Sequence, residues 1–194
     1  MKTAVCLGAD AIGLVFHPAS SRFIDLELGR ELRHVIPPFV TVVALLLDEN
    51  VDYIADVIEQ VKPDCLQFHG RESADFCEQF AMPYIKSIPM GSDINPIEYA
   101  SAYTAASGFL LDSNAIGKVG GSGDSFDWSR IPQAFDSPLI LAGGLSSSNV
   151  GKAILQTRPW AVDVSSGVES GKGIKDAEKM ASFFREAKRA DESL

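Results

Sequence analysis

Hydrophobic residues gather along the chain in short runs that end in small or polar residues. Most of these runs are nearly continuous rather than alternating, which is typical of strands buried on both faces of a parallel sheet. The seven runs span Ala11–Phe16, Phe39–Leu47, Cys65–His69, Tyr84–Met90, Gly108–Asp112, Leu139–Gly143 and Ala161–Ser165. The pattern therefore predicts seven parallel strands.

Between these runs, apolar residues recur at steps of three and four, as they do on one face of a helix. Helices are predicted over Asn50–Val61, Ser73–Phe80, Ile94–Tyr103, Ser147–Leu155 and Ile174–Lys188. Ser73 and Ser147 are expected to be N-caps, because their hydroxyl groups can accept from the first turn. The opening residues Lys2–Leu7 are interpreted as the end of a helix that runs into Gly8.

A strand followed by a helix recurs about every 20 to 30 residues. Two architectures fit this repeat: an open doubly wound sheet and a closed (β/α)₈ barrel. The barrel is favoured, because the crossovers are similar and no glycine-rich nucleotide fingerprint follows the first strand. A barrel needs eight strands and the pattern supplies seven. We therefore expect residues 1–194 to form a single α/β domain, a TIM barrel that lacks its first strand and starts within the first helix.

Composition and charge narrow the class of partner. The chain has 194 residues, of which 46% are hydrophobic and 22% charged, as expected of one compact domain. Its net charge is −9 and it has no basic run, which argues against binding nucleic acid or an anionic membrane. No stretch approaches the roughly 20 apolar residues of a membrane span.

Cysteine and histidine usage indicates a reducing compartment and no metal centre. Three cysteines at unrelated spacings argue against a disulfide framework, so a cytoplasmic location is expected. The three histidines are scattered, and no Cys/His cluster has metal-ligand spacing. Cys6 falls in the opening helix, Cys77 in another helix and Cys65 at the start of a strand. All three are expected to be structural rather than catalytic.

Polar residues that follow the strands are the candidates for chemistry, because in a barrel they face the active site. Asp112 ends a buried run, where a carboxyl partly removed from water suits a general acid; a turn-forming role is the alternative. Arg22, alone in its loop, could hold a carboxylate through two parallel hydrogen bonds or simply be solvated. His69 could donate to a ligand or merely end a strand.

Two late loops have the character of a phosphate site. Gly143 and Gly144 let the backbone approach a ligand closely, and Ser165, Ser166 and Gly167 offer small side chains with accessible N–H groups. Backbone N–H groups and a helix N-terminus can hold a phosphate without lysine. A tight turn is the alternative for each loop alone. The glycine-rich segment 113–125 is predicted to be a mobile lid.

Several segments closely resemble the phosphoribosylanthranilate isomerase family, in order over nearly the whole chain. They are Ala9–Phe16, Ser20–Phe23, Leu66–Gly70, Gly120–Gly123 with Phe126–Trp128, Leu141–Leu145 and Asp163–Glu169. The resemblance implies a (β/α)₈ barrel of tryptophan biosynthesis. Such enzymes convert N-(5-phosphoribosyl)anthranilate to 1-(2-carboxyphenylamino)-1-deoxyribulose 5-phosphate, an Amadori rearrangement that needs no cofactor.

The resemblance also implies residue roles. Asp112 would protonate the ribose ring oxygen, and Arg22 would hold the anthranilate carboxylate. The phosphate would be held by Gly143, Gly144, Ser166 and Gly167, and the pocket would be lined by His69 and Asp163.

The family's general base is a cysteine on the first strand, in a Lys-Ile-Cys-Gly-like motif that residues 1–194 do not contain. Met1 aligns within the helix after that strand, as if an internal methionine had been chosen as the start. We therefore expect slow catalytic turnover by residues 1–194. We also expect self-association through the strand edges Ala11–Phe16 and Ala161–Ser165. The alternatives are another phosphosugar barrel enzyme, for which Lys86 is the only lysine near a strand end, and a non-catalytic phosphate-ligand binder.

Overall fold

Seven parallel strands curl into one sheet in the computed structural model, which describes residues 1–114, 125–132 and 134–194. The strands are β1 (Ala11–Val15), β2 (Thr41–Leu46), β3 (Cys65–Phe68), β4 (Tyr84–Pro89), β5 (Gly108–Asp112), β6 (Leu139–Leu141) and β7 (Ala161–Val162). Each strand pairs with the next one along the chain. The predicted seven strands are confirmed. Residues 115–124 of the expected lid lie outside the described residues.

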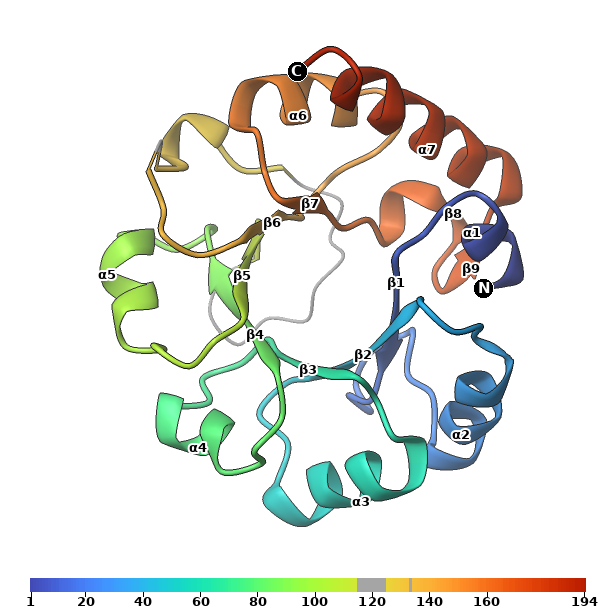
Figure 1. The fold of residues 1–194 in the computed structure, drawn as a ribbon, viewed down its shortest axis with the longest axis vertical. Coiled ribbons are helices and arrows are strands. Elements are labelled where there is room, and N and C mark those ends of the chain that lie inside the picture. Colours follow the sequence, from blue (N-terminus) through green and yellow to red (C-terminus); the bar gives the residue numbers. More distant parts are fainter. Residues whose placement is uncertain (115–124, 133) are drawn as a thin grey trace.

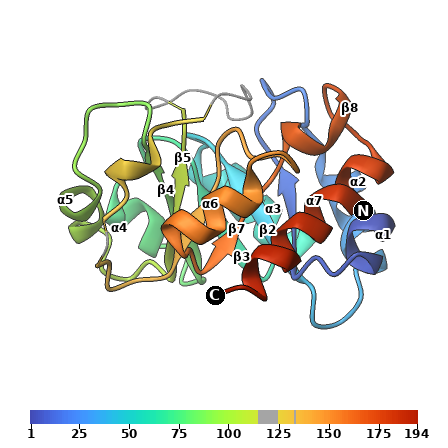
Figure 2. The ribbon, with the colours of Figure 1, turned by 90° about the horizontal axis from the view of Figure 1, so that it is seen from above.

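Helices lie outside the curl, as Figure 1 shows. They are α1 (Lys2–Cys6), α2 (Leu26–Val35), α3 (Val51–Val61), α4 (Ala74–Glu78), α5 (Pro96–Ser101), α6 (Val150–Thr157) and α7 (Ala177–Asp191), with two 3₁₀ turns, η1 (Trp128–Arg130) and η2 (Ser166–Val168). In the side view of Figure 2, α6 and α7 lie along the outside of the sheet. None of the helices among the described residues is long and apolar enough to span a bilayer.

The helix ends follow from short polar side chains. Asn50 and Ser73 cap α3 and α4 by accepting from the backbone N–H groups of Tyr53 and Phe76, so the Ser73 prediction is confirmed. The Ser147 prediction is wrong, because α6 is capped at Asn149. The Asn149 side chain bonds backwards instead, accepting from Ser146 N at 2.8 Å and donating to Gly144 O at 2.9 Å.

Two elements differ from the sequence-based expectation. The segment 26–35 forms a helix, α2, that the hydrophobic pattern did not predict. Ile174 does not begin the last helix: Ile174–Lys175 forms β9, antiparallel to β8 (Glu169–Gly171). Helix α7 begins only after Asp176, whose side chain caps it. The hairpin β8–β9 lies beside the loop after β1, because a Cβ atom at Gly173 would lie 2.9 Å from Ser21 O.

The main core lies between the sheet and the helices. Side chains pointing outwards from the strands, such as Phe16, Leu46 and Phe68, are almost completely buried. The Phe68 ring packs against the rings of Phe76 and Tyr84, with centroids 6.3 and 5.8 Å away. Burying such aromatic side chains contributes a large share of the apolar area that stabilises a domain of this size.

The curled sheet has two edges, β1 and β7, each paired on one side only within the described residues. Figure 1 shows them as the two ends of the curl. Part of the β1 edge is covered, because Val15 O accepts from Ile24 N at 3.0 Å. Ala11 and Gly13 of β1 and Ala161 of β7 are exposed. The described residues thus form a barrel-like sheet that is open between β7 and β1.

A buried ion pair braces β3 against β4. The Lys86 side chain is completely buried, and its Nζ donates to Glu72 Oε2 and to Gly70 O, each at 2.7 Å. Glu72 Oε1 accepts from Asp48 N at 2.8 Å, and Glu72 O accepts from the Tyr103 hydroxyl at 2.9 Å. Lys86 therefore holds the loops after β2 and β3 against strand β4.

The Lys86→Met variant is expected to lose about 3–5 kcal/mol of unfolding free energy, because it leaves the Glu72 carboxylate buried without its cation. Urea unfolding followed by circular dichroism measures the loss. The matched control is Lys188→Met, which removes an exposed lysine 3.9 Å from Glu192 and is expected to cost less than ~1 kcal/mol. Equal losses in the two variants would contradict the structural role of Lys86.

Candidate active site

Three titratable side chains follow β3, β5 and β7 at the same end of the sheet. His69 comes directly after β3, Asp112 ends β5, and Asp163 comes directly after β7. His69 Nδ1 lies 3.8 Å from Asp112 Oδ2, and the charge of Asp163 acts on both groups. Because the strands are parallel, residues far apart in sequence meet at one rim.

The Asp112 carboxyl group is buried and oriented. The residue is 6% exposed, and its backbone oxygen accepts from Met90 N at 2.7 Å, which fixes it to the end of β4. Oδ1 accepts from Asn114 N at 3.3 Å and from the Ser113 hydroxyl at 3.4 Å. Oδ2 faces His69 across a distance too long for a direct hydrogen bond. Ser113 and Asn114 therefore orient the carboxyl group with Oδ2 toward His69.

Burial shifts the neighbouring groups toward their neutral forms. Desolvation lowers the pKa of His69, although the carboxylates of Asp112 and Asp163 oppose the shift. Desolvation and then the charge of Asp112 raise the pKa of Asp163, against His69 and Lys175. Asp163 is exposed to solvent, so water moderates the desolvation, and repulsion from Asp112 acts in the same direction on its pKa. The site holds a neutral imidazole between two acidic groups.

The loop after β6 approaches the acid closely. Gly143 and Gly144 have φ angles of +78° and +65°, a region that side chains disfavour. A Cβ atom at position 143 would lie 2.5 Å from Ser113 N, the residue next to Asp112. Glycine at position 143 thus lets the two loops touch.

The loop after β7 joins the same cluster. A Cβ atom at Gly167 would lie only 1.9 Å from Leu145 O, so this position accepts no side chain. Asn149 holds the intervening loop by its bonds to Ser146 N and Gly144 O. Ser165 precedes η2, which begins at Ser166 and includes Gly167. The candidate acid and both candidate phosphate loops are therefore in one contiguous structure.

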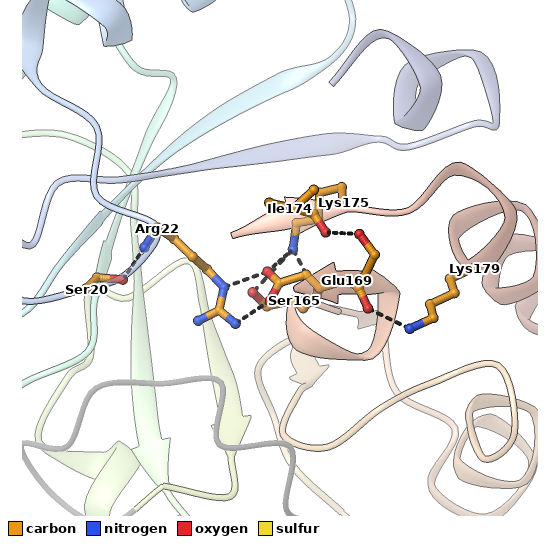
Figure 3. Close-up of polar contacts among 8 residues, drawn as sticks. Ser20, Arg22, Ser165, Glu169, Ile174, Lys175 and Lys179 are labelled. Atoms are coloured by element: carbon orange, nitrogen blue, oxygen red, sulfur yellow. Dashed lines mark hydrogen bonds and ion pairs between the residues drawn. The ribbon is translucent and has the colours of Figure 1, made fainter. Parts of the chain in front are cut away.

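Arg22, from the loop after β1, is held by a residue that follows β7. Its Nε and Nη2 donate to Glu169 Oε1 and Oε2 at 2.7 and 2.8 Å. Lys175 Nζ also contacts Glu169 Oε1, at 3.0 Å, and donates to Ser165 O at 2.8 Å (Figure 3). The arginine and the Ser165 loop are thus tied to one hairpin.

The His17 ring and the three cysteines have other contacts and surroundings. The His17 ring contacts Glu49 Oε1 through Nδ1 at 2.7 Å. Cys6 is exposed on α1, and burial raises the pKa values of Cys65 and Cys77 to about 11 and about 12, so both stay protonated thiols at neutral pH. Across the described ranges, no three His, Cys, Asp or Glu side chains are grouped as metal ligands would be.

Sequence reasoning assigned no role to Glu169 or Lys175. Glu169 stands 147 positions from Arg22, so no local spacing indicated their contact. The helix predicted over Ile174–Lys188 includes Lys175, so the sequence gives no indication that Lys175 pairs with Glu169 across β8 and β9. The only available signal was that Glu169 ends one of the segments on which the family resemblance rests.

Comparison with known proteins gives a consistent result. Residues 1–186 match the family model described as N-(5'-phosphoribosyl)anthranilate isomerase. The N-(5'-phosphoribosyl)anthranilate isomerase of Nitrosospira multiformis is 48% identical over 182 residues, which are 94% of this chain and 88% of that protein. The crystal structure of phosphoribosylanthranilate isomerase from Thermotoga maritima is 38% identical, covers 97% of this chain and 92% of its own, and superposes with a TM-score of 0.87.

A further similar structure contains a ligand. It is a phosphoribosylanthranilate isomerase in complex with reduced 1-(o-carboxyphenylamino)-1-deoxyribulose 5-phosphate, 35% identical, with a TM-score of 0.80 and coverage of 97% of this chain and 92% of its own. The fold and the sequence thus point to the same group of proteins.

Acid titration is expected to expose the contribution of Glu169 to stability. Desolvation alone would raise the pKa of Glu169, but hydrogen bonds and charges from Arg22 and Lys175 outweigh it and lower the pKa from 4.5 to about 2. A carboxyl with a lowered folded-state pKa stabilises the fold above its unfolded pKa, and this stabilisation disappears as the pH falls to the folded value. The stability difference between wild type and Glu169→Gln is therefore expected to shrink between pH 4.5 and 2.

Urea unfolding at a series of pH values measures this difference. Glu192→Gln, at a carboxylate that is 67% exposed, is the control and is expected to change the unfolding free energy little at any pH. A Glu169→Gln difference that stays constant down to pH 2 would show that the pairing does not shift this carboxyl.

Proposed function

The chain belongs to the N-(5'-phosphoribosyl)anthranilate isomerase family, and we propose that its site performs that family's reaction through the residues assembled at the strand ends. The substrate is N-(5'-phosphoribosyl)anthranilate and the product is 1-(2-carboxyphenylamino)-1-deoxyribulose 5-phosphate. The reaction is a step of tryptophan biosynthesis. The observation that carries the assignment of residues is the direct contact of the loops after β5, β6 and β7.

Asp112 is the general acid in this proposal. Its carboxyl group donates a proton to the furanose ring oxygen, the bond between that oxygen and C1 breaks, and the nitrogen lone pair forms an iminium at C1. The buried Asp112 side chain has one oxygen held by Ser113 and Asn114 and the other facing the interior. An acid oriented in this way can contribute about a hundredfold to ten-thousandfold to the rate.

The phosphate is held by the loops after β6 and β7. In this proposal the backbone N–H groups of Gly143, Gly144, Ser166 and Gly167, with Ser165, bind the phosphate. Support comes from the positive φ angles of the first pair and from the close approach of Gly167 to Leu145 O. Backbone N–H groups suit a dianion because they need no desolvated lysine.

The anthranilate carboxylate is held by Arg22, and His69 and Asp163 line the pocket between the two anionic ends. Arg22 reaches the same rim through Glu169, which follows the Ser165–Gly167 loop. A guanidinium gives a carboxylate two parallel hydrogen bonds, which fixes the aromatic ring as well as the charge. The neutral form of His69 is suited to hydrogen bonding with a sugar hydroxyl.

The second half of the reaction needs a group that removes the C2 proton, so that the enol can become the ketone. The described cysteines do not serve: Cys6 is exposed on α1, and Cys65 and Cys77 are buried thiols with raised pKa values. Residues 1–194 therefore supply the acid and the binding groups of the proposed site, and not the family's cysteine base. We propose slow turnover together with retained binding.

Two alternatives have less support. A phosphosugar barrel that uses a catalytic lysine would need Lys86, which is paired with Glu72 and completely buried. A non-catalytic binder would not need an oriented carboxyl beside the phosphate loops. A cytoplasmic location fits the three free cysteines.

Binding and turnover are expected to separate in the 194-residue chain. The reduced product analogue should bind, whereas turnover should lie about a hundredfold to ten-thousandfold below that of the Nitrosospira multiformis relative, because a general base contributes about that much. Calorimetry measures the binding, and consumption of N-(5'-phosphoribosyl)anthranilate measures the turnover.

The Asp112→Asn variant separates the two roles further. It should bind the analogue as the wild type does and lose the residual turnover, because asparagine fills the same space without a transferable proton. Failure of the wild-type chain to bind the analogue would contradict the proposed substrate. Turnover equal to that of the relative would show that another group accepts the C2 proton.

Self-association through the sheet edges is also proposed. A strand edge with unpaired N–H and C=O groups pairs readily with a second copy. Light scattering is expected to give a mass above the 20.9 kDa of one chain, and Ala161→Lys, which puts a charge on the exposed β7 edge, should reduce it. A wild-type monomer whose unfolding midpoint does not depend on protein concentration would refute the proposal.

A further inference from the structure

The pairing between Arg22 and Glu169 uses one defined edge of the guanidinium. Nε and Nη2 meet the two oxygens of Glu169 at 2.7 and 2.8 Å, and the side chains are only 15% and 5% exposed. A two-point contact of this kind fixes the plane of the guanidinium as well as its position.

Glu169 is itself held in place by two lysines, Lys175 and Lys179. Lys175 is its register partner across the antiparallel hairpin β8–β9, and Lys175 Nζ lies 3.0 Å from Glu169 Oε1. Lys179, on the first turn of α7, donates to Glu169 O at 2.6 Å. Figure 3 shows the two lysines reaching the glutamate from β9 and α7. The hairpin is thus a rigid support for the arginine.

We propose that Glu169 and Lys175 are positioning residues that make Arg22 a selective receptor for the substrate's aryl carboxylate. The proposal rests on the proposed function, in which Arg22 binds that carboxylate. Glu169 sets the direction of the guanidinium, and Lys175 offsets the negative charge that Glu169 brings.

Orientation is the contribution of Glu169. An arginine side chain has many rotamers, and a ligand that binds a loose one must order it. With the Nε–Nη2 edge held by Glu169, this ordering is already complete before the ligand arrives. Preorganised groups bind more tightly because the ordering cost is removed from the binding step.

Charge is the contribution of Lys175. The Glu169 carboxylate repels the substrate carboxylate, and Arg22 and Glu169 together carry no net charge. Adding Lys175 leaves the cluster with one net positive charge, in a chain whose overall charge is −9. Lys175 also donates to Ser165 O at 2.8 Å, in the loop proposed to hold phosphate. The hairpin therefore contacts both the proposed carboxylate site and the proposed phosphate site.

The test compares two ligands that differ in one group. The first is the reduced product analogue, and the second is its counterpart made from aniline, which lacks the carboxylate and keeps the phosphate. Calorimetry on the 194-residue chain gives the ratio of their Kd values. Wild type is expected to favour the carboxylate ligand about tenfold to hundredfold, the range for a hydrogen-bonded charge pair.

Glu169→Gln removes one negative charge as well as the orientation of Arg22. Because Lys175 already offsets that charge, the lost orientation is expected to dominate and to reduce this ratio about twofold to tenfold, the range for losing one preordered side chain. Lys175→Met should reduce it as well, because the charge of Glu169 is then uncompensated. Lys172→Met, which removes an exposed lysine from the turn between β8 and β9, is the matched control and should leave the ratio unchanged. A merely structural role would weaken both ligands equally and would not move the ratio.

The outcomes separate the two proposals. A wild-type ratio near one would overturn the role of Arg22 and, with it, this inference. A clear wild-type preference that Glu169→Gln leaves unchanged or increases would overturn the inference alone, since Glu169 would then be a bystander or a competitor for Arg22. If Glu169→Gln binds neither ligand, Lys175→Met decides: a reduced ratio supports the positioning role, and an unchanged ratio overturns it.

Discussion

The parallel pairing of seven consecutive strands is the constraint on which the site depends. Because every strand runs in the same direction, the residues that follow the strands lie at one rim of the sheet. His69, Asp112 and Asp163 come from β3, β5 and β7 and are nevertheless close enough for their charges to interact. A change in the register of one strand would move its contribution away from this rim, so the chemistry is as sensitive to the sheet as to the side chains.

The rim is held in place by polar contacts behind it. The Lys86–Glu72 pair fixes the loops after β2 and β3 against β4, and the Glu169 hairpin fixes Arg22 from the other end of the curl. Both carboxylates are almost completely buried, where a charge is tolerated only with a partner. Close contacts at Gly143 and Gly167 join the loops between them. These contacts hold ordinary side chains and backbone groups in fixed positions at the rim.

The strands could be predicted from the sequence because doubly buried strands are continuous apolar runs, and Gly108–Asp112 agrees with the structure at both ends. The predicted helix over Ile174–Lys188 is wrong at its start, and no helix is predicted over 26–35. Two residues such as Ile174 and Lys175 fit either a helix or a strand, and pairing with β8 makes them a strand. The residues of the candidate site follow strands and were found for that reason. Glu169 was given no role, because its contact with Arg22 joins opposite ends of the chain.

One rim of the sheet is proposed to hold the phosphate, the acid and the carboxylate receptor of a single substrate. A crystal structure of the chain with the reduced product analogue bound tests this arrangement. We expect the phosphate on the backbone N–H groups of the Gly143–Gly144 and Ser166–Gly167 loops, with Asp112 within hydrogen-bond distance of the sugar chain and the aryl carboxylate on Arg22. A phosphate bound elsewhere, or an Asp112 carboxyl group turned away from the ligand, would contradict it.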